Sequence, residues 1–204
     1  MSLLTYTIIF AIVAYLIGSI PTGYLIVKAK AKQDIREVGS GSTGATNVKR
    51  VLGKKWFFIV MLLDALKGAM PVVLAKLATN TLFVDTYGIV PVVCAILVIV
   101  GHSKPVFLQF KGGKSVASGV GTILALNFFV GIAIAIVWSI VTYISKYVSL
   151  GSIVALVLSP FIMYFFKNPI AYTAYCTIAA IYIVYLHREN IKRLIKGEEN
   201  KVRN

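Results

Sequence analysis

The feature that most constrains this chain is a series of long apolar runs that recur from one end to the other. They occupy residues 3–27, 56–77, 82–100, 116–143, 150–166 and 170–186. About 20 apolar residues in a helix cross the roughly 30 Å hydrocarbon core of a bilayer, where a helix satisfies its own backbone polar groups. We therefore expect an all-α, polytopic integral membrane protein. Since no segment between the runs is long enough for a soluble domain, residues 1–204 are expected to form a single membrane domain.

Two of these runs are expected to be interrupted. In the first run, Gly18, Pro21 and Gly23 would bend or loosen the helix. The fourth run has 28 residues, which at about 1.5 Å per residue would extend about 42 Å, well beyond the bilayer core. It therefore either tilts steeply or folds back near Asn127 as two shorter helices, at about 116–126 and 128–145.

The distribution of positive charge distinguishes these alternatives. The chain carries 21 Lys and Arg against 7 Asp and Glu, and the cytoplasmic loops of membrane proteins are rich in Lys and Arg. Four groups hold most of them: eight cations over residues 28–55, three over 104–114, Lys146 alone, and six over 188–203. Seven crossings place all four groups on one face, whereas six crossings place the tail opposite the first loop. We therefore expect seven transmembrane helices, with the N-terminus outside and the C-terminus in the cytoplasm. The same bias accounts for the net charge of +14, so no nucleic-acid partner is expected.

The polar segments between the helices carry the candidate chemistry. The first segment, residues 38–50, reads VGSGSTGATNVKR and combines glycines and hydroxyls with two cations at its end. Such a loop can present backbone N–H groups and hydroxyls to an anion, and glycines such as Gly41 permit the close approach. It is not a Walker A loop, because Gly53 and Lys54 are followed by Lys55. The alternative is a flexible linker.

The second segment, residues 101–119, repeats this composition as GHSKPVFLQFKGGKSVASG. This segment leads into the next predicted helix, and the N-terminus of a helix attracts anions. Two such loops on one face favour an anion site, although a tight turn is the alternative for Gly112 and Gly113. In the third segment, residues 147–153, Ser149 is placed to cap the next helix and to donate toward the same face. In the fourth segment, residues 187–201, His187 and Asn190 share one face of a predicted helix. The alternative for this segment is an amphipathic tail that binds anionic lipid headgroups.

Charge also occurs inside the second apolar run, where Asp64 and Lys67 are three residues apart on one helical face. Intramembrane charges are rare and are usually paired or functional, so a structural ion pair is the alternative to a functional role. No cluster of His, Cys or carboxylate residues has the spacing of metal ligands, and no G-x-S-x-G motif occurs. We therefore expect no resident metal, no cofactor and no serine-hydrolase triad.

Five segments, taken in order, resemble a known family. They read GSGSTGATNVKR, LDALKG, GHSKPVFLQFKGGKSVA, SLGSI and HRENIKRLIKGEE, and they resemble the bacterial acyl-phosphate:glycerol-3-phosphate acyltransferases, the PlsY family, over essentially the whole chain. The resemblance implies a multi-pass protein of the bacterial cytoplasmic (inner) membrane with seven helices and a cytoplasm-facing site. The implied reaction moves a fatty acyl group from acyl phosphate to the sn-1 hydroxyl of glycerol 3-phosphate, giving lysophosphatidic acid and phosphate. The implied partners are these two substrates and the lipid bilayer, and we expect a monomer.

The resemblance also implies which residues form the site, motif by motif. Three of them are candidates for catalysis: His187, Ser40 and Asn190. The substrate-binding positions are Ser40, Gly41, Asn47, Arg50, His102, Lys111, Lys114, Ser149 and Asn190. Among these, Ser40, Arg50 and Lys111 look like phosphate binders. One departure concerns Ser42, because the family usually has Asn at that position, and its role is left open.

Two rival functions compete with the acyltransferase. An anion transporter would usually show inverted repeats with broken helices near the midplane, and the sequence shows no repeat. A lipid-binding protein without activity would not need ordered glycine loops. An acyl phosphate is an activated anhydride, so the enzyme needs mainly to position the hydroxyl and stabilise the leaving phosphate. The hydroxyl proton then goes to His187 or to a phosphate oxygen of a bound substrate, and the sequence leaves both open.

Overall fold

The structure is a computed structural model that describes residues 2–79 and 81–202. Residues 1, 80, 203 and 204 of the expected single domain lie outside these ranges. The described residues form ten α-helices and the short 3-10 helices η1 (Ile35–Glu37) and η2 (Val106–Leu108). The α-helices are α1 (Leu3–Ser19), α2 (Thr22–Ala31), α3 (Ala45–Leu52), α4 (Lys54–Ala78), α5 (Ile89–Ser103), α6 (Val116–Leu126), α7 (Phe128–Ser145), α8 (Val148–Phe165), α9 (Ile170–Leu186) and α10 (Arg188–Ile195). The expected all-α class is confirmed.

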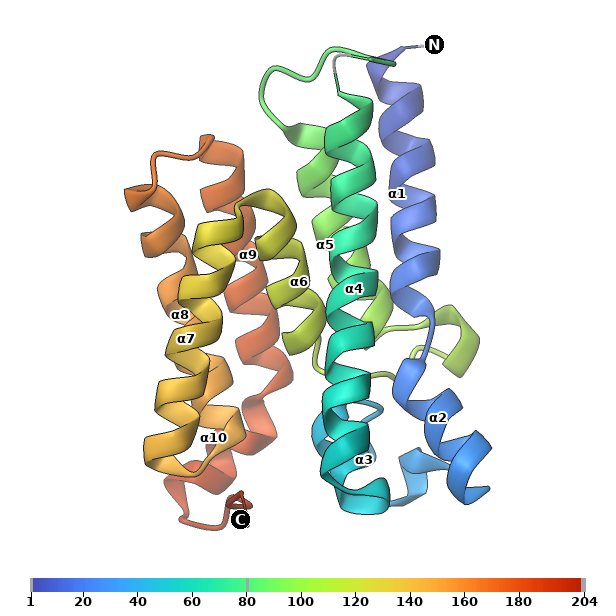
Figure 1. Ribbon diagram of the computed structural model, residues 1–204, viewed down its shortest axis with the longest axis vertical. Coiled ribbons are helices and arrows are strands. Elements are labelled where there is room, and N and C mark those ends of the chain that lie inside the picture. Colours follow the sequence, from blue (N-terminus) through green and yellow to red (C-terminus); the bar gives the residue numbers. More distant parts are fainter. Residues whose placement is uncertain (1, 80, 203–204) are drawn as a thin grey trace.

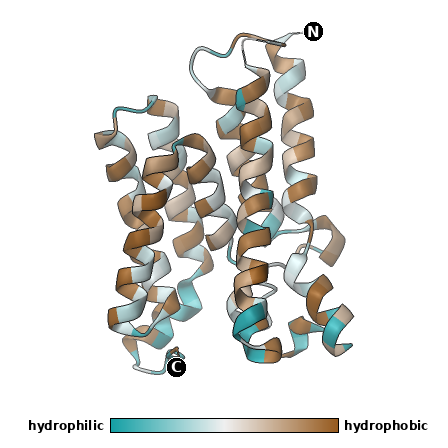
Figure 2. Ribbon diagram, viewed as in Figure 1, coloured by the Kyte–Doolittle hydropathy of each residue, from teal (hydrophilic) through white to brown (hydrophobic). Residues whose placement is uncertain are grey.

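The surface of the helices is that of an integral membrane protein. Among the described residues, five helical segments are long and apolar enough to cross a bilayer, and six if α9 and α10 count as one span bent by 62°. Their outward faces expose large apolar side chains such as Leu62, Phe161 and Ile181, which lipid would cover. In Figure 2 the polar stretches of α3 and α10 lie at the lower end, below the apolar parts of the bundle.

Both expected interruptions occur. In the first run, α1 ends at Ser19 and α2 begins at Thr22, with Pro21 between them. In the fourth run, the side chain of Asn127 accepts a hydrogen bond from the Val130 N–H at 3.1 Å and caps α7. The chain reverses there, so that α6 and α7 lie side by side (Figure 1). The predicted helices at 116–126 and 128–145 are confirmed, while the count of seven crossings remains a prediction.

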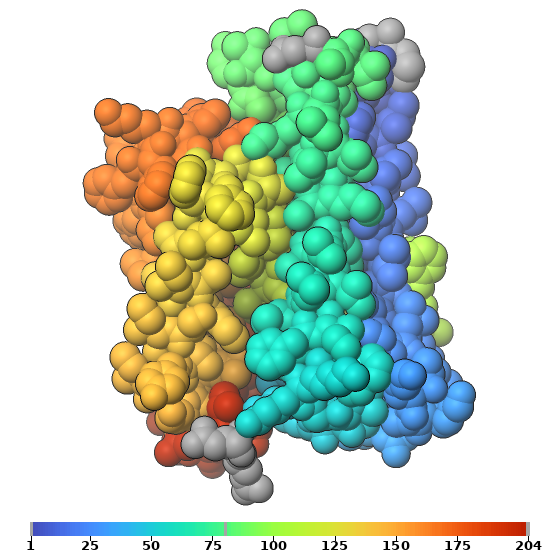
Figure 3. All heavy atoms as spheres, viewed as in Figure 1, coloured from blue at the N-terminus to red at the C-terminus, as the bar shows by residue number. Residues whose placement is uncertain are grey.

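The helices form two columns that meet along α4 and α6. Figure 3 shows the N-terminal half in blue to green beside the C-terminal half in yellow to red. Glycine makes the close approach possible: a Cβ on Gly68 would lie 2.3 Å from the Ser118 carbonyl oxygen, and one on Gly121 would lie 2.0 Å from that of Ala65. Small residues are the usual means of close helix packing in membranes. Since the second polar loop leads directly into α6, this contact also sets where that loop lies.

The polar elements lie together at one end of the molecule. In Figure 1, α2, α3, α10 and the turn between α7 and α8 are at the end opposite the start of α1. The C-terminal tail is held at this end of the molecule, because the Val202 N–H donates to the carbonyl of Lys146 at 2.8 Å. The described members of three of the four cationic groups recognised in the sequence therefore lie on or next to these elements, and the candidate site is found beside them.

Candidate functional site

The first loop is organised around the side chain of Asn47, which is only 2% exposed. Its Nδ2 donates to the carbonyls of Val38 at 2.8 Å, Ser42 at 3.0 Å and Ile35 at 3.2 Å. Its Oδ1 accepts from the Ser40 N–H at 3.2 Å. One amide thus replaces the regular backbone hydrogen bonds that this glycine-rich segment lacks. Asn47, expected to bind substrate, has its side chain committed to holding the loop.

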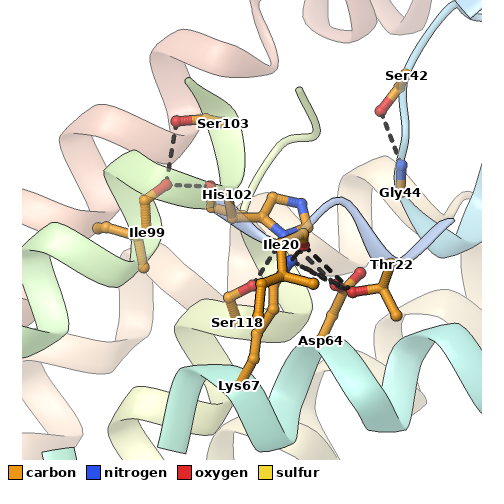
Figure 4. Close-up of polar contacts among 11 residues, drawn as sticks. Ile20, Thr22, Ser42, Gly44, Asp64, Lys67, Ile99, His102, Ser103 and Ser118 are labelled. Carbon is orange, nitrogen blue, oxygen red and sulfur yellow. Dashed lines mark hydrogen bonds and ion pairs between the residues drawn. The ribbon is translucent and has the colours of Figure 1, made fainter. Parts of the chain in front are cut away.

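The folded loop presents Ser40 and Arg50 together at the surface, where both are exposed. Gly39 permits this arrangement, because its φ of +61° is in the left-handed region and a Cβ there would lie 2.4 Å from Asn47 Oδ1. The same Cβ would be 3.3 Å from Cδ of Arg50, so the arginine side chain passes directly beside the loop. Ser42 remains within the loop, where its Oγ accepts from the Gly44 N–H at 3.3 Å (Figure 4).

The second loop folds back onto the end of α5. The Gly112 N–H donates to the carbonyl of Ser103, and the Gly113 N–H to that of His102, both at 3.1 Å. The two N–H groups that a phosphate-cradling loop would offer are therefore bound internally. The loop presents lysine side chains instead: Lys111 is exposed, and Lys114 is half-buried.

The fourth segment contributes two buried groups at the junction of α9 and α10. His187 is 4% exposed, and its Nδ1 lies 2.8 Å from the carbonyl oxygen of Ile183. A carbonyl only accepts, so Nδ1 carries the proton and Nε2 of the neutral ring is free to accept one. The Oδ1 of Asn190, also buried, contacts Nζ of Lys114 and so joins the fourth segment to the second.

A residue that the sequence reasoning missed, Glu199, lies at the centre of these groups. Its Oε1 accepts from Nδ2 of Asn190 at 2.7 Å and from Oγ of Ser149 at 3.0 Å. Its Oε2 accepts from Nε of Arg193 at 2.7 Å. The predicted cap is wrong for Ser149, because α8 begins at Val148 and the hydroxyl is directed to this carboxylate instead.

Charges from three segments act on one another here. Burial alone would raise the pKa of Glu199, but hydrogen bonds from Asn190, Arg193 and Ser149 outweigh it and hold that pKa below its ordinary value. Burial lowers the pKa of Lys114, and the charges of Arg193 and Arg50 lower it further. An excess of cations with one carboxylate among them is an environment suited to a dianion.

Several expected site residues therefore come together, and others do not. Lys114, Ser149 and Asn190 meet around Glu199, with Arg50 near enough to act through its charge. His102 is buried behind Gly113, where a Cβ would lie 2.1 Å from its Nε2. Over residues 2–79 and 81–202, no three His, Cys, Asp or Glu side chains gather as metal ligands do.

Comparison with known proteins shows which family of sequences this chain matches. Residues 8–197 match the family model described as glycerol-3-phosphate acyltransferase. The glycerol-3-phosphate acyltransferase of Trichormus variabilis is 42% identical over 204 residues, covering 94% of this chain and 89% of that protein. The one from Clostridioides difficile is 42% identical over 204 residues, covering 99% of this chain and 98% of that protein.

Solved structures of proteins with this activity are similar to this chain in fold as well as in sequence. The crystal structure of PlsY, an integral membrane glycerol 3-phosphate acyltransferase, in its glycerol 3-phosphate form matches with a TM-score of 0.90 at 37% identity, covering 97% of this chain and 96% of that one. The lysophosphatidic acid form matches with a TM-score of 0.87 at 36% identity, covering 97% and 95%. With its motifs, its helical order and these matches in agreement, the chain belongs to the PlsY family of glycerol-3-phosphate acyltransferases.

Proposed function

We propose that this protein transfers a fatty acyl group from acyl phosphate to the sn-1 hydroxyl of glycerol 3-phosphate, as a single-domain monomer of the bacterial cytoplasmic membrane. The observation that carries the proposal is the cluster of Lys114, Ser149 and Asn190 around the Glu199 carboxylate, with Arg50 close by. Ser149, Asn190 and Arg193 already bind one anion, the Glu199 carboxylate, through charge-assisted hydrogen bonds, the chemistry that a phosphate needs. The two PlsY structures, in forms named for glycerol 3-phosphate and lysophosphatidic acid, support the acceptor and the product.

The reaction needs two phosphates near each other, one on each substrate. The hydroxyl oxygen attacks the acyl carbonyl carbon, the bond from that carbon to the phosphate oxygen breaks, and phosphate leaves with the electron pair. In this scheme Ser40, Arg50 and Lys111 bind phosphate, and Lys114 stabilises the charge on the leaving group. Asn190 positions Lys114 through its Oδ1.

The hydroxyl proton has two candidate acceptors. Nε2 of His187 is one, because the hydrogen bond from Nδ1 to Ile183 fixes the ring and leaves Nε2 unprotonated. An oxygen of a bound phosphate is the other. The residue five positions after His187 is Lys192, so no carboxylate stands at that position to orient the ring. An activated donor lowers the demand on such a base, which favours acyl phosphate over a thioester.

The test supplies the purified protein, in detergent or in nanodiscs, with labelled glycerol 3-phosphate and one of three palmitoyl donors. We expect lysophosphatidic acid from palmitoyl phosphate and little from palmitoyl-CoA or from palmitoyl-acyl carrier protein. A comparable kcat/KM with the CoA ester would overturn the proposed donor. No product from any of the three would overturn the acyltransferase itself.

A further inference from the structure

The buried ion pair of α4 takes no part in the site described above. Asp64 and Lys67 are 2% and 8% exposed, and Nζ of Lys67 lies 2.8 Å from Oδ1 of Asp64. Charges at this depth in a membrane protein are costly and are usually retained for a function. The pair also contacts other segments of the chain, and these contacts point to a function.

One set of contacts reaches the break between α1 and α2. The hydroxyl of Thr22, the first residue of α2, donates to Asp64 Oδ1 at 2.9 Å. Nζ of Lys67 donates to the carbonyl of Ile20 at 2.7 Å, just beyond the end of α1. Figure 4 shows both side chains directed at this break. The pair therefore satisfies backbone and side-chain groups that the interrupted helix leaves open, and it fixes where α2 begins.

The start of α2 in turn supports the first loop. A Cβ on Gly23 would lie 2.0 Å from the carbonyl oxygen of Thr43 and 3.0 Å from Cγ2 of Val48. The loop and α3 therefore rest directly on the first turn of α2. A shift at this break would move the loop that presents Ser40 and Arg50.

A second set of contacts reaches the second loop through His102. Nδ1 of this ring lies 3.6 Å from Asp64 Oδ1 and 3.0 Å from Oγ of Ser118. On its other side the ring packs against Gly113, whose N–H also donates to the His102 carbonyl at 3.1 Å. The residue that follows is Lys114 of the candidate site.

From these contacts we propose that Asp64 and Lys67 are positioning residues for acyl transfer, which set the two anion-binding loops relative to each other. The inference rests on the function proposed above. The pair acts through Thr22 on one loop and through His102 on the other. Because the two substrates must react within a narrow range of distance and angle, a displacement of about 1 Å can lower the rate about 100-fold.

This role can be separated from a merely structural one. A buried ion pair often contributes little net stability, and apolar residues of similar volume can replace both partners without loss. We therefore expect the double variant Asp64→Leu, Lys67→Met to fold, with a Tm somewhat below that of the wild type because the Ile20 carbonyl and the Thr22 hydroxyl lose these partners. If positioning is its role, kcat/KM falls tenfold or more, and KM rises for both glycerol 3-phosphate and palmitoyl phosphate. A folded double variant with wild-type kcat/KM would overturn the proposal.

The matched control lies on the same helix. Lys76 also donates to main-chain carbonyls, those of Ala125 at 2.9 Å and Leu126 at 3.0 Å, but at the end of α4 away from the loops. Lys76→Met is expected to keep wild-type kinetics. If the double variant does not fold, Thr22→Val and Thr22→Ser decide the question. Loss of the hydroxyl is expected to lower kcat/KM three- to tenfold relative to the serine variant, and equal values would overturn the proposal.

A binding measurement keeps this test independent of the proposed reaction. A ligand that binds only the folded protein raises its Tm. Glycerol 3-phosphate is expected to raise the Tm of the wild type and of Lys76→Met, and to raise that of the double variant much less. A wild type that forms no product but still shows this pattern would count against the proposed reaction and not against the positioning role. An equal shift in all three proteins would overturn the positioning role.

Discussion

At the scale of single residues, the site depends on side chains that each connect two segments. Asn190 shows this most clearly, because its Oδ1 contacts Lys114 while its Nδ2 donates to Glu199. The orientation of the amide is therefore set from both sides. Arg50 differs, since it is exposed beside the first loop, where the proposed function requires it to bind phosphate.

Arg50→Ala is expected to lower kcat/KM tenfold or more while the protein still folds. The reason is the loss of charge-assisted hydrogen bonds to phosphate, worth about 1.5–3 kcal/mol each. Arg50→Lys should recover only part of the activity, because the planar two-pronged donor is lost. Steady-state kinetics with palmitoyl phosphate measure both. Lys49→Ala, the same change of charge one residue earlier in α3, is the control, and near-normal activity in Arg50→Ala would remove this arginine from the site.

Glu199 is expected to make the stability of the protein depend on pH. Its hydrogen bonds hold its pKa below the ordinary value of 4.5, so its contribution is present above pH 4.5 and is lost as the pH falls through the folded-state pKa. The Tm difference between wild type and Glu199→Gln should therefore be largest near pH 7 and shrink below pH 4.5. Glu198→Gln changes an exposed neighbour and is the control. A difference that stays constant down to pH 3 would contradict this assignment.

Some residues of the candidate site could be predicted from the sequence, and others could not. Ser149, Asn190 and Lys114 could be selected because each lies in a motif of a resembled family. Glu199 is the last residue of one of these motifs, but the resemblance assigned it no role, and it meets Asn190 nine residues away in an irregular turn after the end of α10. No helical spacing predicts such a contact. Likewise, the family resemblance implied that Asn47 binds substrate, and only the fold shows its amide bound to main-chain carbonyls.

At the scale of elements, interruptions of helices do most of the positioning. The breaks at Pro21 and Asn127 were predictable, since proline disrupts a helix and the fourth apolar run exceeds the bilayer core. The bend of 62° at His187 was not predictable, because it needs neither proline nor glycine. It arises where the buried ring of His187 hydrogen-bonds back to Ile183, and it directs α10 across the site.

The contact between α4 and α6 provides a prediction at this scale. Gly121→Ala is expected to destabilise the protein by about 1–3 kcal/mol, because its Cβ would overlap the main chain of Ala65. For a chain of this size each kcal/mol lowers the Tm by about 2–4 °C. Gly119→Ala, on the same helix, is the control, since its Cβ would meet only the flexible end of Ile183 at 3.2 Å. Equal Tm values for the two variants would show that the helices separate freely.

At the scale of the whole molecule, two helical columns bring together segments that are far apart in the sequence. The N-terminal column supplies Arg50, and the C-terminal column supplies Ser149 and Asn190. The second loop, which carries Lys114, connects α5 of one column to α6 of the other. The site therefore lies where the columns meet, at the end of the bundle where the polar elements gather (Figure 1). Which side of the membrane this end faces decides whether soluble glycerol 3-phosphate from the cytoplasm can reach it.

The charge pattern predicts that it faces the cytoplasm. Eighteen of the 21 cations fall in the four groups that seven crossings place on one face, and an N-terminus outside follows. Single cysteines at the exposed positions Thr46, Gln109 and Asn200 should react with an impermeant maleimide only after the cells are opened, whereas one at Thr81 should react in intact cells. The native Cys94 and Cys176 are both buried, so little background labelling is expected. The comparison of Gln109 with Asn200 is the decisive one, because it spans α6 and α7. If these two positions react from opposite faces, the short helix α6 and its partner α7 do not make two crossings, and six crossings replace seven.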